Sequence, residues 1–196
     1  MKKLYPTVIW DRRADGKKLY ITFDDGPTPG VTEKVLDLLD EFNAKATFFC
    51  LGRNAERHPD LFEEIKKRGH TVGNHTYSHL KGWNTDDETY YDDTELADHI
   101  IGSRLFRPPY GRIKKSQIKI LQAKYKIILW EIMSHDYEPR LSEKICLKAV
   151  LRFSREGSIL VFHDSLKASG KVLYVLPKLM AKFAEKGFTF EAIPEN

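Results

Sequence analysis

Cysteine and long apolar runs are both scarce in this chain of 196 residues, which contains two cysteines. Cys50 and Cys146 each lie within a short apolar run, where a thiol packs as a small hydrophobic side chain. No stretch reaches the roughly 18 consecutive apolar residues of a membrane-spanning helix. Residues 1–13 also lack the apolar core of a signal peptide, so the sequence predicts a cytoplasmic protein. A mature or truncated form of an exported protein has the same appearance.

A surplus of one charge is also missing, because 32 lysines and arginines stand against 28 aspartates and glutamates. This near-balance excludes a polybasic arm that binds nucleic acid. Linkers rich in proline, glycine or serine are absent, and so are internal repeats. With 41% hydrophobic residues, the chain suits one domain over residues 1–196. Its oligomeric state cannot be read from the sequence.

Short apolar runs alternate with longer amphipathic segments along the chain. The short runs, predicted as seven strands, are 19–23, 46–51, 70–73, 103–106, 126–130, 158–162 and 188–192. The predicted helices are 31–42, 59–67, 89–101, 115–123, 141–155 and 171–186. This alternation indicates an α/β fold with a mainly parallel sheet, either open and doubly wound or closed as a small barrel. Both architectures place chemistry at the carboxyl ends of the strands.

Polar side chains follow five of the predicted strands. They are Asp24 and Asp25, the segment 74–79, the segment 107–111, Asp136 after Trp130, and His163. His75 and His79 are four residues apart, and on a helical turn both imidazoles would project from one face. Together with Asp25 they would form a site of two histidines and one carboxylate, which suits hydrolytic zinc or non-haem iron.

The neighbouring groups suit acid–base chemistry. If Asp25 binds a metal, Asp24 is left free beside it to remove a proton from water. A histidine such as His163 has an ordinary pKa of about 6.5, so near neutral pH it can act as the acid that protonates a departing amine. We expect Arg107 to contact Asp24, and Asp136 to hold His163 protonated and oriented.

These segments resemble the ordered motifs of one known family. The segments are 22–27, 74–79, 107–111, Trp130 with 136–137, and 160–164, and they are similar to the five motifs of the polysaccharide deacetylases. This family is carbohydrate esterase family 4, with the NodB homology domain. The resemblance extends over residues 18–193, and five motifs in order are much more specific than any one of them.

The resemblance implies a distorted (β/α) barrel, commonly with seven parallel strands and outer helices. It implies zinc, or another divalent ion such as Co²⁺, as the cofactor. The metal ligands that it assigns are Asp25, His75 and His79, the base is Asp24 and the acid is His163, with Arg107 and Asp136 as their partners. It places the backbone N–H of Tyr110 at the oxyanion, and it implies that Pro109, Tyr137, Trp130 and Leu160 bind substrate, the last two as walls of the pocket for the acetyl methyl group.

The implied reaction is metal-dependent hydrolysis of N-acetyl groups on an acetylated glycan of the chitooligosaccharide or peptidoglycan type. Two positions depart from the family pattern, since Met133 stands where an aspartate is usual and Tyr137 where a tryptophan is usual. Three alternatives stay open at this point: an O-acetyl esterase acting on xylan, a glycan-binding protein with little turnover, and an iron-dependent oxygenase. No aromatic and basic motif supports nucleic-acid binding.

Overall fold

Parallel strands form the centre of the fold. The structure is a computed structural model, and it describes residues 5–13 and 16–195. The strands are β1 (Lys18–Asp24), β2 (Thr47–Cys50), β3 (Thr71–Asn74), β4 (Leu105–Phe106), β5 (Lys126–Ile127), β6 (Ile132–Met133), β7 (Ile159–His163) and β8 (Thr189–Phe190). The helices are α1 (Thr32–Glu41), α2 (Gly52–Arg57), α3 (Pro59–Lys67), α4 (Asp87–Ile101), α5 (Lys115–Leu121), α6 (Glu143–Phe153) and α7 (Ser169–Ala184), with 3-10 turns η3 (Gly82–Asn84) and η4 (Pro109–Gly111).

The sheet has the order β5-β4-β3-β2-β1-β7-β6, and β8 pairs with β1. The sheet is curled, and side chains of strands that are not neighbours in it, such as Leu105 of β4 and Ile159 of β7, pack in one cluster with Tyr20 and Phe49. No ladder between β5 and β6 is present in residues 5–13 and 16–195, so the described sheet forms a curled half-barrel. Parallel strands with outer helices confirm the (β/α) architecture that the resemblance implies.

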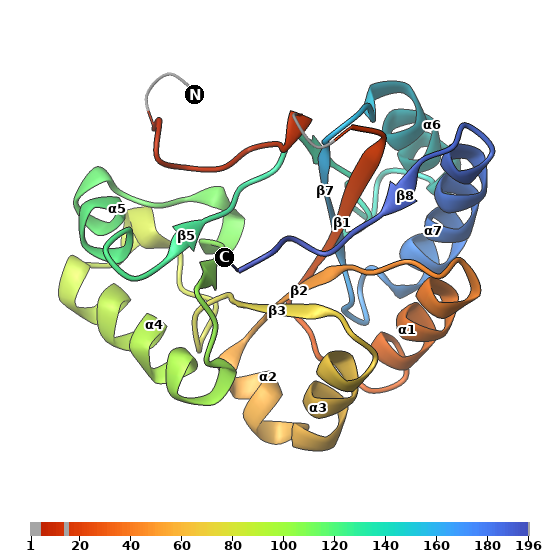
Figure 1. The fold of residues 1–196 in the computed structure, drawn as a ribbon. Helices are drawn as coiled ribbons and strands as arrows, with labels where there is room; N and C mark the ends of the chain where they lie inside the picture. Colours follow the sequence, from red (N-terminus) through yellow and green to blue (C-terminus); the bar gives the residue numbers. More distant parts are fainter. Residues whose placement is uncertain (1–4, 14–15, 196) are drawn as a thin grey trace.

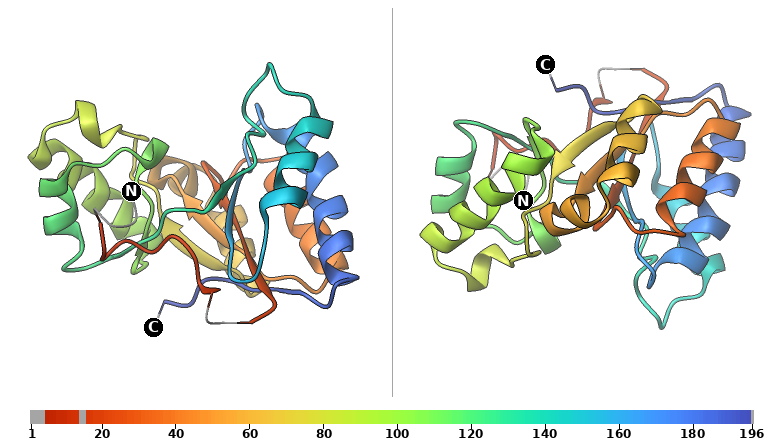
Figure 2. Two further views of the ribbon diagram at one scale, coloured as in Figure 1. Left: turned by 90° about the horizontal axis from the view of Figure 1, so that it is seen from above. Right: turned by 90° about the horizontal axis from the view of Figure 1, so that it is seen from below.

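Helices cover the outer side of the curled sheet (Figure 1). In Figure 1 α4 and α5 lie at the left, α2 and α3 below, and α1, α6 and α7 at the right, and Figure 2 shows the same groups from above and below. The side chains of β1 point alternately to the outer, helix-covered face of the sheet and to its inner face. Leu19, Ile21 and Phe23 enter the core beneath the helices. Asp24 therefore lies on the inner side, at the carboxyl end of the strand.

Capping residues explain where several helices begin and end. The Asp86 side chain accepts a hydrogen bond from the Thr89 backbone N–H at the start of α4, and Gly102 ends that helix at φ 62°. Pro59 occupies the first turn of α3, which spans the predicted residues 59–67. No helix among the described residues is long and apolar enough to cross a membrane.

Three local predictions differ from the structure. The two-residue strand β6 was not predicted, because Ile132 and Met133 are too short a run to show alternation. Helix α2 was not predicted, because Ala55 is its single buried residue besides Gly52 and no apolar repeat marks it. The third concerns His75–His79, predicted on a helical turn, which form a loop in the structure.

Candidate active site and metal centre

One pocket at the carboxyl-terminal rim of the sheet collects polar side chains that follow β1, β3, β4, β6 and β7. Parallel α/β folds bind ligands at this rim. The pocket is lined by Asp24, Asp25, His75, His79, Lys81, Tyr110, Arg112, Trp130, Met133, Tyr137, His163, Ser165 and Lys167. Most of the side chains predicted from the strand ends are therefore brought together.

Asp24 is held by a fully buried arginine. Arg107 Nη1 donates to Asp24 Oδ1 at 2.7 Å and to Thr22 Oγ1 at 2.6 Å. The same guanidinium donates to two backbone carbonyls and lies 4.0 Å over the ring of Phe49. The second Asp24 oxygen, Oδ2, lies 4.0 Å from His75 Nε2. One oxygen of Asp24 is thus fixed by the guanidinium while the other faces the histidine pair.

Asp25, His75 and His79 form a group that could hold a metal ion, and no other group of three or more His, Cys, Asp or Glu residues does so among the described residues. Their candidate ligand atoms lie within 4.8 Å of one another. Asp25 Oδ1 lies 3.2 Å from His79 Nε2 and 3.8 Å from His75 Nε2. This oxygen is buried and makes no hydrogen bond of acceptable geometry, which is costly without a further partner. A cation between the three side chains would supply that partner, so the residues present fit a divalent metal.

The protonation states of this group also fit a metal. Burial lowers the pKa of His75 to about 4, so its imidazole is neutral at pH 7, as a ligand must be. His75 Nδ1 lies 2.7 Å from the Arg107 carbonyl oxygen, an arrangement that leaves Nε2 for the ion. Burial favours the neutral acid at Asp25, but the facing imidazoles, His79 foremost, outweigh it and hold the pKa of Asp25 below its ordinary value.

The two loops that carry the ligands adopt backbone conformations that are rare for their residues. Asp25 has φ 82°, and Thr76 and His79 both have φ 64°. Such residues persist only where surrounding contacts fix them, and they gather at functional sites. The carboxylate of Asp93 provides such contacts, since it accepts hydrogen bonds from the backbone N–H groups of two residues within the histidine loop, Tyr77 and Ser78.

Asp164 anchors the loop that carries Asp25. Its carboxylate accepts hydrogen bonds from Gly26 N at 3.0 Å and from Thr32 Oγ1 at 2.6 Å, and the side chain is fully buried. Burial raises the pKa of Asp164 to about 7. A Cβ atom on Gly26 would lie 1.9 Å from Asp164 Oδ2, so only glycine allows this approach.

We therefore expect Gly26→Ala to lower the free energy of unfolding by about 1–3 kcal/mol, as overpacking does, and to weaken metal binding. Thermal or urea unfolding and a metal titration measure both effects. Gly170→Ala is the matched control, because a Cβ there meets nothing within 4 Å. Equal unfolding free energies for the two variants would contradict the anchoring role of Asp164.

His163 is held by Asp136 through both carboxylate oxygens. His163 Nδ1 lies 2.7 Å from Asp136 Oδ1, and the His163 backbone N–H donates to Asp136 Oδ2 at 2.8 Å. Burial favours the neutral imidazole, but Asp136 outweighs it and, with Asp24 and Asp25, raises the pKa of His163 to about 9. His163 is accordingly protonated at neutral pH, and it reaches the pocket as an acid.

Aromatic side chains form much of the pocket wall. The Tyr110 ring lies 4.6 Å from that of His79, at a residue whose φ is 60°. The Tyr137 ring lies 5.0 Å from that of His163. Trp130 and Met133 also line the pocket, so both unusual positions of the fourth motif, Met133 and Tyr137, border the candidate centre.

Two predicted pocket residues lie elsewhere. Leu160 is fully buried in the core beneath the helices, and it is not a wall of this pocket. The physical reason is strand alternation, because Leu160 is three residues from His163 and so faces the opposite side of β7. Pro109 is buried at the start of η4 and does not line the pocket either.

Sequence reasoning missed Lys81, Arg112, Ser165 and Lys167, which line the pocket. Each lies two to four residues beyond a recognised motif residue, namely His79, Tyr110 or His163. Their closeness in sequence to those motif residues was the available signal.

Comparison with known proteins identifies the family of this chain. The family model described as "Polysaccharide deacetylase" matches residues 11–126. A peptidoglycan-N-acetylglucosamine deacetylase of Bacillus cereus is 33% identical over 99% of this chain and 95% of its own length. A chitooligosaccharide deacetylase of Azorhizobium caulinodans is 31% identical over 90% of this chain and 92% of its own.

Among solved structures, the Bc1960 peptidoglycan N-acetylglucosamine deacetylase in complex with an N-hydroxybenzamide has a TM-score of 0.93. The two chains are 28% identical, and the match covers 99% of this chain and 94% of the other. The family model covers more than half of this chain, and the likeness in fold extends over nearly all of it. The chain therefore belongs to the polysaccharide deacetylase family, the carbohydrate esterases of family 4.

Proposed function

We propose that this protein hydrolyses N-acetyl groups on amino-sugar residues of a glycan of the peptidoglycan or chitooligosaccharide type. The observation that carries the proposal is the pairing of two opposed proton-transfer groups in one pocket. Asp24 is an acceptor fixed by Arg107, and His163 is a donor held protonated by Asp136. The named activities of the relatives in Bacillus and Azorhizobium support the same reaction.

Asp24 is the proposed general base. Its fixed oxygen, Oδ1, is already engaged by Arg107, so Oδ2 accepts the proton of the attacking water. Proton transfer to a positioned side chain accelerates hydrolysis by about 10²–10⁴-fold. The buried guanidinium keeps the carboxylate in place.

Asp25, His75 and His79 are the proposed ligands of a zinc ion or another divalent cation such as Co²⁺. Such an ion, when bound, supplies Lewis-acid polarisation of the acetyl carbonyl and lowers the pKa of water. The three side chains would hold it through one carboxylate oxygen and two imidazole nitrogens. The backbone N–H of Tyr110 is proposed as a further donor to the oxyanion.

His163 is the proposed general acid. Breaking the C–N bond of the tetrahedral intermediate requires a proton on the leaving nitrogen, and an imidazolium at this position supplies it. Asp136 stabilises the charged form before the transfer. Acetate and a free amino sugar are the products.

The pH profile of Asp136→Asn tests the acid. His163 must be protonated, so activity is present below its pKa of about 9 and is lost as the pH rises through that value. Removing the carboxylate lowers the pKa of His163, and we expect the alkaline limb of kcat/KM to move to lower pH. An alkaline limb at the wild-type position would contradict the assignment.

The proposed function itself is tested by acetate release from N-acetylglucosamine oligomers, with acetylated xylan assayed in parallel. Protein with a confirmed divalent metal should release acetate from the amino-sugar oligomers, and chelation should abolish this release. Release from xylan alone would establish an O-acetyl esterase. Binding of the oligomers without any release would establish a glycan-binding protein, an alternative that Met133 in the pocket wall favours.

A further inference from the structure

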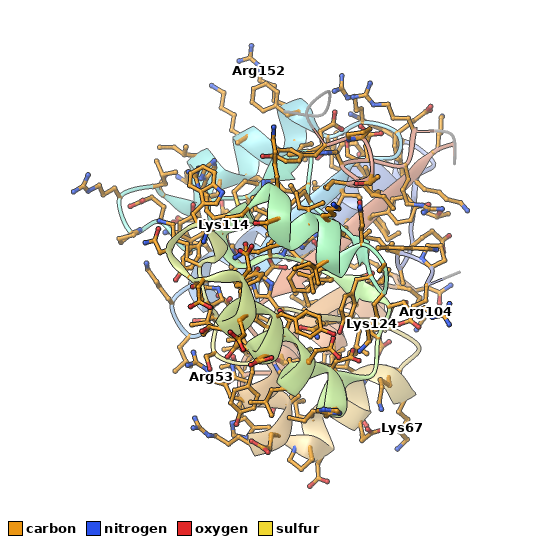
Figure 3. The ribbon with its side chains drawn as sticks, turned by 90° about the vertical axis from the view of Figure 1, so that its left-hand side faces the viewer. Arg53, Lys67, Arg104, Lys114, Lys124 and Arg152 are labelled. Atoms are coloured by element: carbon orange, nitrogen blue, oxygen red, sulfur yellow. The ribbon has the colours of Figure 1, made fainter. Side chains whose placement is uncertain are left out.

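Three basic side chains stand around the mouth of the candidate active site. Lys81, Arg112 and Lys167 line the pocket and are exposed. None of them forms an ion pair with an acid in residues 5–13 and 16–195. Basic residues elsewhere include paired ones, such as Lys124, whose Nζ lies 2.8 Å from Asp98 Oδ2. Figure 3 labels other basic side chains, among them Arg53, Lys67 and Arg152, which are spread over the face of the molecule that it shows.

The three cations lie on two sides of the reacting centre. Arg112 Cζ lies 4.2 Å from the ring of Trp83, which is exposed and anchored by a hydrogen bond from its Nε1 to the Ile113 carbonyl oxygen at 3.0 Å. Lys81 shares this side, because the next residue, Gly82, packs against the Arg112 backbone so closely that a Cβ on it would lie 2.6 Å from the Arg112 carbonyl oxygen.

Lys167 lies on the other side, where His163 is found. Lys167 Nζ is 5.8 Å from the centre of the Tyr137 ring, and that ring is 5.0 Å from the ring of His163. An aromatic ring therefore lies next to a cation on each side, with Trp83 beside Arg112 just outside the pocket lining and Tyr137 beside Lys167 within it. A ring of this kind offers an apolar face to a sugar, and the adjacent cation offers a donor to an anion.

Acidic side chains do not balance these cations. Asp24 and Asp25 are the carboxylates among the lining residues. Asp24 is already paired with Arg107, and Asp25 belongs to the candidate metal group. The mouth of the pocket is thus positive, and a cleft lined by one sign of charge concentrates ligands of the opposite sign.

We propose that Lys81, Arg112 and Lys167 select a glycan that carries carboxylates on the sugars flanking the reacting N-acetyl sugar, in preference to a neutral one. This inference rests on the proposed N-deacetylase function. It assigns to the three cations a role in specificity, with no part in bond making or breaking.

The test compares three oligomers of equal length. One is neutral oligo-N-acetylglucosamine, the second has a 3-O-lactyl carboxylate on alternate sugars, and the third is the methyl ester of the second. We expect kcat/KM for the carboxylate form to exceed that for the ester by about tenfold at low salt, and the excess to shrink as ionic strength rises. The ester controls for the shape of the lactyl group.

Charge-removing variants assign the effect to the named residues. Lys81→Gln, Arg112→Gln and Lys167→Gln should each reduce the carboxylate-to-ester ratio by about two- to fivefold, the size expected for loss of an exposed charge pair, because kcat/KM falls more on the carboxylate form than on the ester. Lys67→Gln is the matched control, since Lys67 is 83% exposed and lies just before β3, at the opposite end of the strands from the pocket.

The outcomes separate this inference from the function on which it rests. Equal kcat/KM on the carboxylate form and its ester, with acetate released from both, would overturn the inference and leave the deacetylase in place. A ratio that Lys67→Gln lowers as much as Arg112→Gln does would also overturn it. No acetate from any of the three oligomers would instead count against the proposed function.

Discussion

Asp24→Asn should reduce kcat by about 10²–10⁴-fold on N-acetylglucosamine oligomers while the protein still binds its metal. The amide keeps the shape of the carboxylate but cannot accept a proton from water. Asp25, His75 and His79 are unchanged in this variant, so the affinity for a divalent ion should stay within a few-fold of wild type. Steady-state acetate release and a metal titration on the same preparation measure the two quantities.

Loss of stability has to be separated from loss of the base, because Asp24→Asn leaves the buried Arg107 without its counter-charge. Substrate binding by the folded variant provides the control. An Asp24→Asn protein that retains more than about a tenth of wild-type kcat would contradict the assignment of the base.

Arg107→Met should lower the free energy of unfolding by about 3–5 kcal/mol, since it leaves the carboxylate of Asp24 buried and unpaired. For a domain of this size that is a fall in Tm of roughly 6–20 °C. Arg152→Met is the matched control, because Arg152 is an exposed cation on α6 and should change stability by no more than about 0.5 kcal/mol.

The double variant Asp24→Leu with Arg107→Met gives the sharper test. Replacing both members of a buried ion pair with apolar side chains is often neutral, so the double variant should recover much of the stability lost in Arg107→Met. It should remain inactive, because the base is absent. The two charges are not coupled if the double variant loses as much unfolding free energy as Asp24→Leu and Arg107→Met lose together when each is measured alone.

The strand-end rule accounts for how much of the site could be predicted from the sequence. Parallel strands deliver the residues that follow them to one rim, and this rule alone brings Asp24, Arg107 and His163 together. Contacts between Arg107 and Asp24 and between Asp136 and His163 were expected on the same basis, and the structure contains both.

The remaining errors have local causes. A spacing of four residues does not distinguish a helical turn from a loop, and the loop conformation of His75 and His79 depends on contacts with Asp93, which is distant in sequence. Leu160 was misplaced although strand periodicity alone puts it on the face opposite His163. The hydrogen bond from Gly26 to Asp164 joins residues that follow β1 and β7, and the strand-end rule does not say which groups at the rim pair with one another.

The most direct test of the central claim is the simultaneous measurement of acetate and free amine from an N-acetylglucosamine tetramer treated with metal-loaded protein. The account predicts that one free amine appears for each acetate released, and that both form about 10²–10⁴-fold more slowly with Asp24→Asn. The account is contradicted if folded protein, with its divalent metal confirmed bound, releases neither product. It is also contradicted if acetate is released without a matching amine.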